Sequence, residues 1–148
     1  MSIPSLPTSD ELAKMSKLFS LLDEAGRNRL LASASRRQLA ASEVICREGE
    51  KGDEFFVVVS GKVSVSADDF GTAKSIAHLG RGAFFGEMAV VANQPRSATV
   101  TVVEACDLLV FGRESVESVL RDYPTVRQAL GAVGVRRTEE LLEKLSGS

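Results

Sequence analysis

Residues 80–99 decide how this chain folds, and they read GRGAFFGEMAVVANQPRSAT. On both sides of them, short apolar runs alternate with glycine and acidic turn residues at intervals of about ten residues, which is typical of short β-strands. Within them the alternation stops, because residues 87–92 have the composition of one or two helical turns. Phe84 and Phe85 can anchor this segment to the wall of a sheet. We therefore expect a loop with a short helix, inserted between two strands of one β-structure.

The surrounding β-region covers residues 36–112. Many short strands in one small domain usually close into a sandwich or barrel, because closure removes exposed strand edges. Ser60-Gly61 predicts a two-residue hairpin, and residues 68–71, Asp-Asp-Phe-Gly, predict a second, looser one. The predicted strands are Gln38–Ala41, Val44–Arg47, Glu54–Ser60, Lys62–Ser66, Ala73–Leu79, Ala98–Val103 and Cys106–Phe111.

Helical patterns precede the β-region. Thr8 and Glu11 have the spacing of a capping box, so we expect a helix to begin there. Gly26 is expected to end or bend this helix, and a second short helix is expected at residues 27–33. An apolar stripe at helical spacing is formed by Leu12, Met15, Leu18, Phe19 and Leu22.

Helical patterns also follow the β-region. A helix is expected at Glu114–Arg121, and Pro124 is expected to begin a longer one that reaches Leu145, because proline is tolerated in a first helical turn. Gly131 and Gly134 lie inside this longer helix and weaken it. Its apolar stripe is formed by Val126, Leu130, Val133, Leu141 and Leu145.

Composition excludes several classes of protein. The chain has 148 residues and a formal net charge of −2, so it has the size of one domain and no surplus of cations for a nucleic-acid backbone. Its apolar runs are far shorter than the roughly 18 residues that span a bilayer, and residues 1–7 do not resemble a signal peptide. One histidine, His78, and two separate cysteines, Cys46 and Cys106, predict no metal site. A reducing cytoplasm is the expected location.

The segment from Gly86 to Ser97 combines features that suit a phosphate ester. A helix that starts near Gly86 leaves its first amides unpaired, and such a start attracts an anion. Arg96 follows Pro95 and brings a fixed positive charge that can form two hydrogen bonds with a phosphate. Glu87 can accept a hydrogen bond from a sugar hydroxyl beside that phosphate. A phosphate and a hydroxyl together indicate a nucleotide.

These features make the chain resemble a known family. The run Phe85–Thr99 is similar to the phosphate-binding cassette of cyclic nucleotide-binding domains, and the resemblance is strongest to the cytoplasmic sensor domains of bacterial cyclic nucleotide-gated potassium channels. It implies a single α+β domain, residues 1–148, built on an eight-stranded antiparallel β-roll of jelly-roll type. In that layout residues 8–34 form N-terminal helices, residues 36–112 form the roll with its cassette at 85–99, and residues 113–145 form two C-terminal helices, a hinge and a lid.

The resemblance also implies roles for individual residues of the cassette. Glu87 would bind the ribose 2′-hydroxyl and Arg96 the cyclic phosphate. Ser97 and several backbone amides would complete the anion cage. The cassette residues that would contact the ligand are Gly86, Glu87, Met88, Ala89, Arg96, Ser97 and Ala98.

The base would be held by residues outside the cassette. Strand alternation places Val65 and Leu79 inward, where they would line the base. By resemblance, Val133 and Arg137 of the last helix would cover it. For Arg137 the alternative is that it belongs to the solvated or helix-pairing face, and the neighbouring Arg136 could take its part.

We expect a non-catalytic sensor that binds cyclic AMP, and cyclic GMP more weakly, and that signals through movement of its helices. The cyclic nucleotide is the expected ligand, and no metal or other cofactor is expected. Further partners would be a second copy, an effector protein or a channel domain outside this chain, whereas direct binding to nucleic acid is not expected.

Two other interpretations stay open at this stage. Glu87 and Arg96 could form a structural ion pair in a vestigial pocket, and the apolar stripes at residues 12–22 and 126–145 would then dock a partner or a second copy. An enzyme built on a similar barrel, such as a cupin oxygenase, would need several histidine ligands, and the chain has one.

Overall fold

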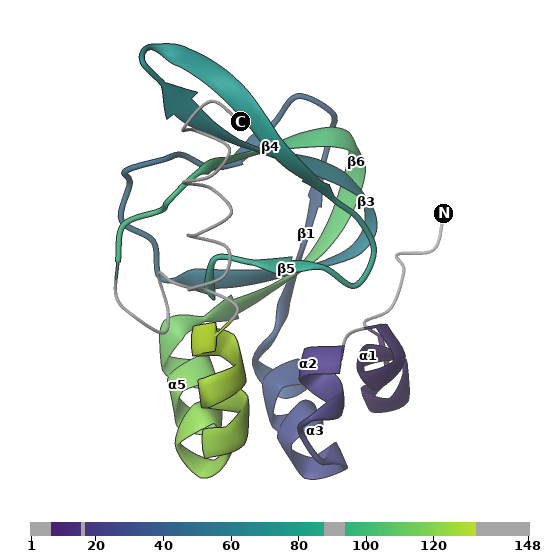
Figure 1. The fold of residues 1–148 in the computed structure, drawn as a ribbon. Coiled ribbons are helices and arrows are strands. Elements are labelled where there is room, and N and C mark those ends of the chain that lie inside the picture. The colour runs from purple at the N-terminus through teal and green to yellow at the C-terminus, as the bar shows by residue number, and fades with distance from the viewer. Residues whose placement is uncertain (1–6, 16, 88–93, 133–148) are drawn as a thin grey trace.

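The protein is an antiparallel β-roll seated on a layer of helices (Figure 1). The computed structural model describes residues 7–15, 17–87 and 94–132. The strands in this part of the chain are β1 (Ser35–Leu39), β2 (Val44–Cys46), β3 (Glu54–Asp69), β4 (Thr72–Leu79), β5 (Phe84–Phe85) and β6 (Thr99–Gly112). The helices are α1 (Ser9–Met15), α2 (Lys17–Ser20), α3 (Glu24–Ser33), α5 (Arg113–Asp122) and a helix over residues 124–132. The predicted α+β class is confirmed.

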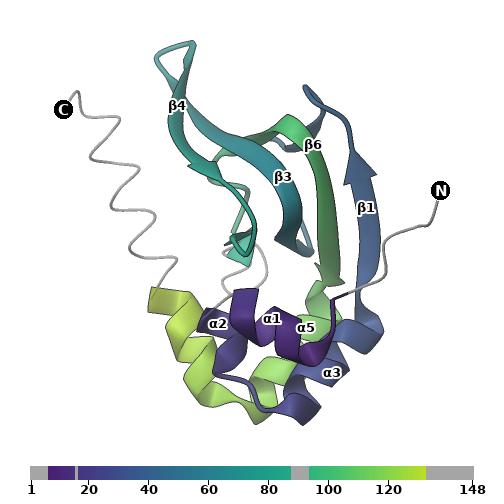
Figure 2. The same ribbon diagram turned by 90° about the vertical axis from the view of Figure 1, so that its right-hand side faces the viewer.

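Two long strands, β3 and β6, make most of the strand pairings in the roll. β6 pairs with β1, β2 and β3, while β3 also pairs with β4 and β5, and every pairing is antiparallel. β3 and β6 each replace two of the predicted strands, since both run on through irregular points where the sequence indicated an end. Counted by these segments, the described strands agree with the eight expected. Figure 2 shows how strongly the long strands curve above the helices.

The predicted hairpin at Ser60-Gly61 is wrong. Gly61 lies in the middle of β3 at a bulge, where the register with β6 shifts on both sides of Lys62. Its φ is 92°, and a Cβ there would lie 2.3 Å from the carbonyl oxygen of Ala105. Glycine is needed because the backbone of β6 passes too close for any side chain. The glycine that indicated a turn in the sequence therefore adopts its positive φ in a bulge instead.

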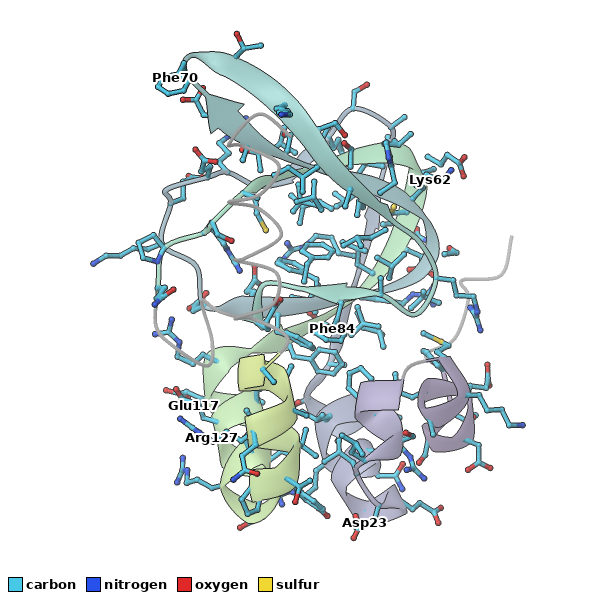
Figure 3. All side chains as sticks on the ribbon, viewed as in Figure 1. Asp23, Lys62, Phe70, Phe84, Glu117 and Arg127 are labelled. Atoms are coloured by element: carbon cyan, nitrogen blue, oxygen red, sulfur yellow. The ribbon has the colours of Figure 1, made fainter. Side chains whose placement is uncertain are left out.

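The second predicted hairpin is confirmed, and it joins β3 to β4. Its two central residues both have positive φ, 51° at Phe70 and 90° at Gly71, as in a type I′ turn. The Asp68 carboxylate accepts a hydrogen bond from the amide of Gly71 at 3.1 Å. Figure 3 shows Phe70 at the protruding tip of this hairpin.

β1 begins at Ser35, earlier than the predicted start at Gln38, because two arginines interrupt the apolar alternation that indicates a strand. Arg36 pairs with Asp107 on one face of β1, and Arg37 pairs with Glu54 on the other. Arg36 has its carboxylate partner on the adjacent strand β6, and Arg37 has its partner on β3, the strand beyond β6. Tertiary contacts therefore accommodate charges that local apolar alternation would exclude from a strand.

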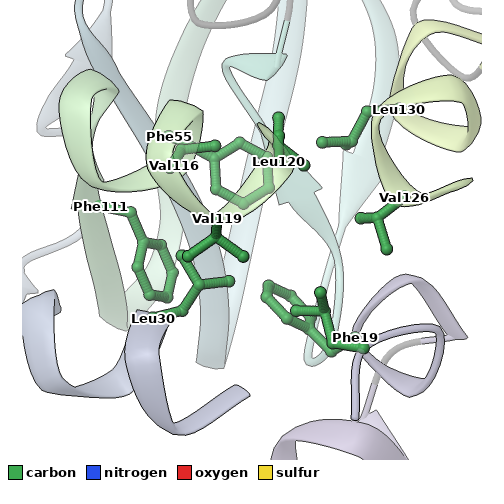
Figure 4. Close-up of a pocket in the computed structure, with 10 residues that line it drawn as sticks. Phe19, Leu30, Phe55, Phe111, Val116, Val119, Leu120, Val126 and Leu130 are labelled. Atoms are coloured by element: carbon green, nitrogen blue, oxygen red, sulfur yellow. The ribbon is translucent and has the colours of Figure 1, made fainter. Parts of the chain in front are cut away.

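Two apolar clusters stabilise the domain on opposite faces of the sheet. One fills the roll and includes Phe56, Phe85 and Leu108, together with Cys46 and Cys106. The other lies between the roll and the helices, where a cavity of about 20 Å³ remains (Figure 4). That cavity is lined by Phe19, Leu22, Leu30, Phe55, Phe111, Val116, Val119, Leu120, Val126 and Leu130.

The N-terminal helices match their prediction at the start and depart from it later. The amide of Glu11 donates to the Thr8 hydroxyl at 3.2 Å, as the capping box requires. Gly26 does not end a helix: α3 already begins at Glu24, with Asp23 as its N-cap. A Cβ on Gly26 would lie 2.8 Å from the Tyr123 ring, so close helix packing explains this glycine. The stripe proposed as a docking face is internal, since Leu12, Phe19 and Leu22 are buried.

The C-terminal helices begin where predicted. α5 covers the predicted segment, and the next helix starts at Pro124, with Val126 and Leu130 buried in the helix-side core. The other predicted stripe residues and Gly134 lie outside the described residues. Within the described part of the chain, the helices lack the length and apolar character needed to cross a membrane.

Candidate functional site

The site begins where β5 ends. Phe84 packs toward the helices (Figure 3). Phe85 packs into the roll, where its ring stacks on Phe56 with centroids 4.9 Å apart. Gly86 follows with a φ of 89°, and a Cβ on it would lie 2.7 Å from Nη1 of Arg96 and 2.8 Å from the carbonyl oxygen of Glu54. Glycine is therefore required at this position by both conformation and space.

Glu87 comes next and is only 4% exposed. It is the first helical residue of the segment, as expected from the sequence, and residues 88–93 lie outside the described part of the chain. A carboxylate is seldom buried unless it has a function or a partner. Its place beside Gly86 is suited to a ligand hydroxyl.

Arg96 is held in place by backbone contacts. Its amide donates to the carbonyl of Glu50 at 2.8 Å, and its carbonyl accepts from the amide of Gly49 at 2.8 Å. The guanidinium carbon lies 5.6 Å from the centre of the Phe56 ring. Gly52 also borders this side chain, because a Cβ there would lie 2.2 Å from Nε of Arg96. The Arg96 side chain thus lies beside Gly52, Gly86 and the ring of Phe56.

The charge of this guanidinium is not fully satisfied. Nη1 of Arg96 is buried, and it has no hydrogen-bond partner among the residues that the structure describes. A buried N–H without an acceptor is costly, and an anionic acceptor would remove that cost. Burial raises the pKa of the nearby Cys46 thiol to about 11, and the positive charge of Arg96 opposes that rise. The site is therefore suited to a small anion.

The residues after Arg96 lead into β6. Ser97 directly follows Arg96 and is exposed, and Ala98 is half-buried. The hydroxyl of Thr99 accepts a hydrogen bond from the amide of Glu48 at 3.0 Å. This contact ties the end of the cassette to the loop after β2, and it was not predicted from the sequence.

Val65 and Leu79 point inward, as strand alternation predicted. Both are half-buried and pack against the apolar cluster inside the roll. They lie on paired strands, with Val65 opposite Ala77 and Leu79 opposite Val63. His78 is exposed, which confirms the outer position predicted for it.

Four predicted ligand contacts lie outside the described residues: Met88, Ala89, Val133 and Arg137. The structure also adds site residues that sequence reasoning missed, namely Gly52 and Phe56. Phe56 could have been found from the alternation of its strand, because it faces the same side as Val58. No local signal marks Gly52, since its role depends on an arginine far along the chain.

The chain is similar to several known proteins. The family model described as "Cyclic nucleotide-binding domain" matches residues 36–123, more than half of the chain. A cyclic nucleotide-gated potassium channel from Rhizobium etli is 32% identical over 120 residues, which are 81% of this chain and 32% of the channel. The chain thus spans about a third of the length of that relative.

Solved structures are similar in both fold and sequence. The regulatory domain of Toxoplasma gondii PKA, crystallised with cAMP, has a TM-score of 0.75 and 33% identity, covering 83% of this chain and 47% of that one. The catabolite activator protein of Thermus thermophilus has a TM-score of 0.75 and 32% identity, covering 87% and 61% respectively.

Proposed function

Because the chain belongs to the cyclic nucleotide-binding domain family, we propose that it is a non-catalytic sensor of cyclic AMP that binds cyclic GMP more weakly. The observation that carries this proposal is the buried Nη1 of Arg96, which faces Gly86 without an acceptor among the described residues. A cyclic phosphate supplies such an acceptor. Cyclic AMP is the ligand of the PKA structure that this chain resembles.

The cyclic phosphate would bind between Arg96 and the backbone after β5. Arg96 donates charge-assisted hydrogen bonds to it, which are stronger than those between neutral groups. The Ser97 hydroxyl and the amides of Gly86, Met88 and Ala98 complete the set, and Ala89 would also contact the ligand. Gly86 allows the ligand to approach the backbone closely, because no Cβ stands in its way.

Glu87 would bind the ribose. Its buried carboxylate accepts a hydrogen bond from the 2′-hydroxyl, and this compensates for the loss of water around both groups. The same carboxylate would repel a second phosphate at that position. This arrangement favours a 3′,5′-cyclic phosphate with a free 2′-hydroxyl.

The base would lie against Val65 and Leu79, with Val133 and Arg137 covering it from the last helix. The two apolar side chains attract either purine by dispersion. They provide no fixed partner for the additional polar groups of guanine, whose unmatched burial costs about 1–3 kcal/mol. The exposed hydroxyl of Ser97 can offset part of this cost, so cyclic GMP still binds.

Binding would be transmitted by the C-terminal helices, with the whole chain acting as one domain. The helix that begins at Pro124 packs Val126 and Leu130 against a core that retains a small cavity. This unfilled space supports a shift of the helix, because its side chains can repack there at a modest cost in free energy. A ligand shifts such an element only by binding one of its positions better than the other. The receiver would be a second copy, an effector or a channel domain, in a reducing cytoplasm where both cysteines stay free.

Titration calorimetry with each nucleotide tests the proposal. Cyclic AMP should bind more tightly than cyclic GMP, and no heat with either at tens of micromolar ligand contradicts the proposal. Arg96→Ala should weaken binding roughly tenfold or more, since a hydrogen bond to a charged group contributes about 1.5–3 kcal/mol. Glu87→Gln should retain more affinity than Glu87→Ala. Equal binding of 2′-deoxy cyclic AMP and cyclic AMP would exclude the ribose role of Glu87.

Base preference needs its own experiment. Both nucleotides should displace one fluorescent cyclic nucleotide, and cyclic AMP should do so at a lower concentration than cyclic GMP. A tenfold preference for cyclic GMP would reverse the prediction. Ser97→Ala should then abolish that preference if the hydroxyl is its source.

A further inference from the structure

A second guanidinium lies close to the anion site. Arg37 extends from β1 to the inner side of the roll, and its guanidinium carbon lies 5.7 Å from the centre of the Phe56 ring. The guanidinium carbon of Arg96 lies 5.6 Å from the same ring centre. The two positive groups therefore lie near the same aromatic ring.

Glu54 also belongs to this group of charges. Both of its carboxylate oxygens accept from Nη2 of Arg37, at 3.1 Å and 3.4 Å. Its backbone carbonyl oxygen borders Gly86, at 2.8 Å from where a Cβ would stand. Besides burial, which is the main cause of its raised pKa, the thiol of Cys46 has its pKa lowered by the positive charges of Arg96 and Arg37 and raised by the negative charges of Glu54 and Glu50.

The carboxylate is thus engaged by one arginine while the other keeps a buried N–H free of partners among the described residues. A carboxylate and a phosphate compete for the same guanidinium, because each can accept two parallel hydrogen bonds from it. If Glu54 were released, it could turn toward Arg96. A ligand would then have to displace it before binding.

We propose that Arg37 is a positioning residue that binds Glu54 and so keeps this carboxylate from occupying Arg96. This inference rests on the proposed function, since it concerns access of the cyclic phosphate to Arg96. Arg37 does not touch the ligand. It raises affinity by removing a competing internal partner, which lowers the fraction of molecules with a blocked site.

A purely structural ion pair would behave differently. The side chains of Arg37 and Glu54 are 40% and 36% exposed, and such pairs contribute little to folding. Loss of the pair should therefore change the melting temperature only slightly. Its effect on ligand affinity should depend on whether the Glu54 carboxylate is present.

The test is a set of four variants measured by calorimetric titration with cyclic AMP. Arg37→Ala should weaken binding about fivefold, which corresponds to about 1 kcal/mol. Glu54→Gln should bind at least as well as the unsubstituted chain. The double variant Arg37→Ala/Glu54→Gln should return to within about twofold of the unsubstituted affinity. Lys62→Ala is the matched control, because it removes a cation from another exposed ion pair of the roll, and it should leave affinity unchanged.

Two results would overturn the inference. Equal affinity of Arg37→Ala and the unsubstituted chain would show that Glu54 does not compete for Arg96. A loss that persists in the double variant would show that Arg37 acts on the ligand or on the shape of the roll. Absence of binding by the unsubstituted chain would refute the proposed function itself, whereas the first two results leave it standing. Circular dichroism of each variant verifies that the roll is intact.

Discussion

Substituting Gly52 by alanine should remove most ligand affinity while leaving the fold intact. A Cβ at this position would lie 2.2 Å from Nε of Arg96 and 2.3 Å from its Cζ. Unbonded heavy atoms prefer about 3.5–4.0 Å, so the guanidinium must retreat by more than about 1 Å. That displacement costs about one charge-assisted hydrogen bond to the phosphate, or 1.5–3 kcal/mol. We expect cyclic AMP affinity to fall roughly ten- to hundredfold.

The stability of this variant should stay close to that of the unsubstituted chain. Gly52 lies outside the left-handed region, and the three heavy atoms nearest to the new Cβ all belong to the end of the flexible Arg96 side chain. Calorimetric titration measures the affinity and thermal unfolding measures the stability. Gly112→Ala is the control, because a Cβ there meets nothing within 4 Å.

A non-additive cycle would identify Arg96 as the cause. Gly52→Ala should weaken binding much less in a chain that already carries Arg96→Ala, because the displaced guanidinium is then absent. The reasoning is refuted if Gly52→Ala binds cyclic AMP as well as the unsubstituted chain does. It is also refuted if the losses from the two substitutions simply add.

Three further predictions concern stability and reactivity. Gly61→Ala should destabilise the fold by about 3 kcal/mol in urea unfolding, because its Cβ would lie 2.3 Å from the Ala105 carbonyl oxygen at a positive φ; a loss below about 1 kcal/mol would exclude the bulge. The pKa of Tyr123 is raised above 10.0 by the hydrogen bond that it donates to Asp23, so this contact should stabilise the fold below pH 10 and be lost as pH rises through the raised pKa. The melting temperature of the unsubstituted chain should therefore fall above pH 10, and Tyr123→Phe should make that fall less steep. The same dependence of melting temperature on pH in both chains would contradict this. With a pKa of about 11, Cys46 should resist iodoacetamide at pH 8 until the chain unfolds, since only about one thiol in a thousand is ionised; mass spectrometry of the native protein would detect a failure.

Sequence patterns were reliable where a local interaction is sufficient to set the structure. The capping box at Thr8 and Glu11 and the start of a helix at Pro124 were both predicted, because each depends on backbone groups within one turn. The turn at Phe70-Gly71 was predicted for the same reason. Its hydrogen bond to Asp68 closes within four residues.

The same patterns failed where a distant element determines the structure. Gly26 resembled a helix end and Gly61 resembled a hairpin, but each glycine makes room for a segment far along the chain, Tyr123 in one case and Ala105 in the other. A glycine by itself shows only that a side chain is absent. It does not show whether conformation or a close neighbour requires that absence.

For the site, the amino-acid sequence by itself determined the chemical groups and their order: a glycine, a carboxylate and an arginine at the spacing of a phosphate-binding cassette. It also determined that Val65 and Leu79 face inward, because side chains alternate along a strand. Only the tertiary structure decided what surrounds those groups. Glycine at position 52, the ring of Phe56 and the pairing of Arg37 with Glu54 come from other strands and loops, and charges and rings separated in sequence meet only after the roll has closed.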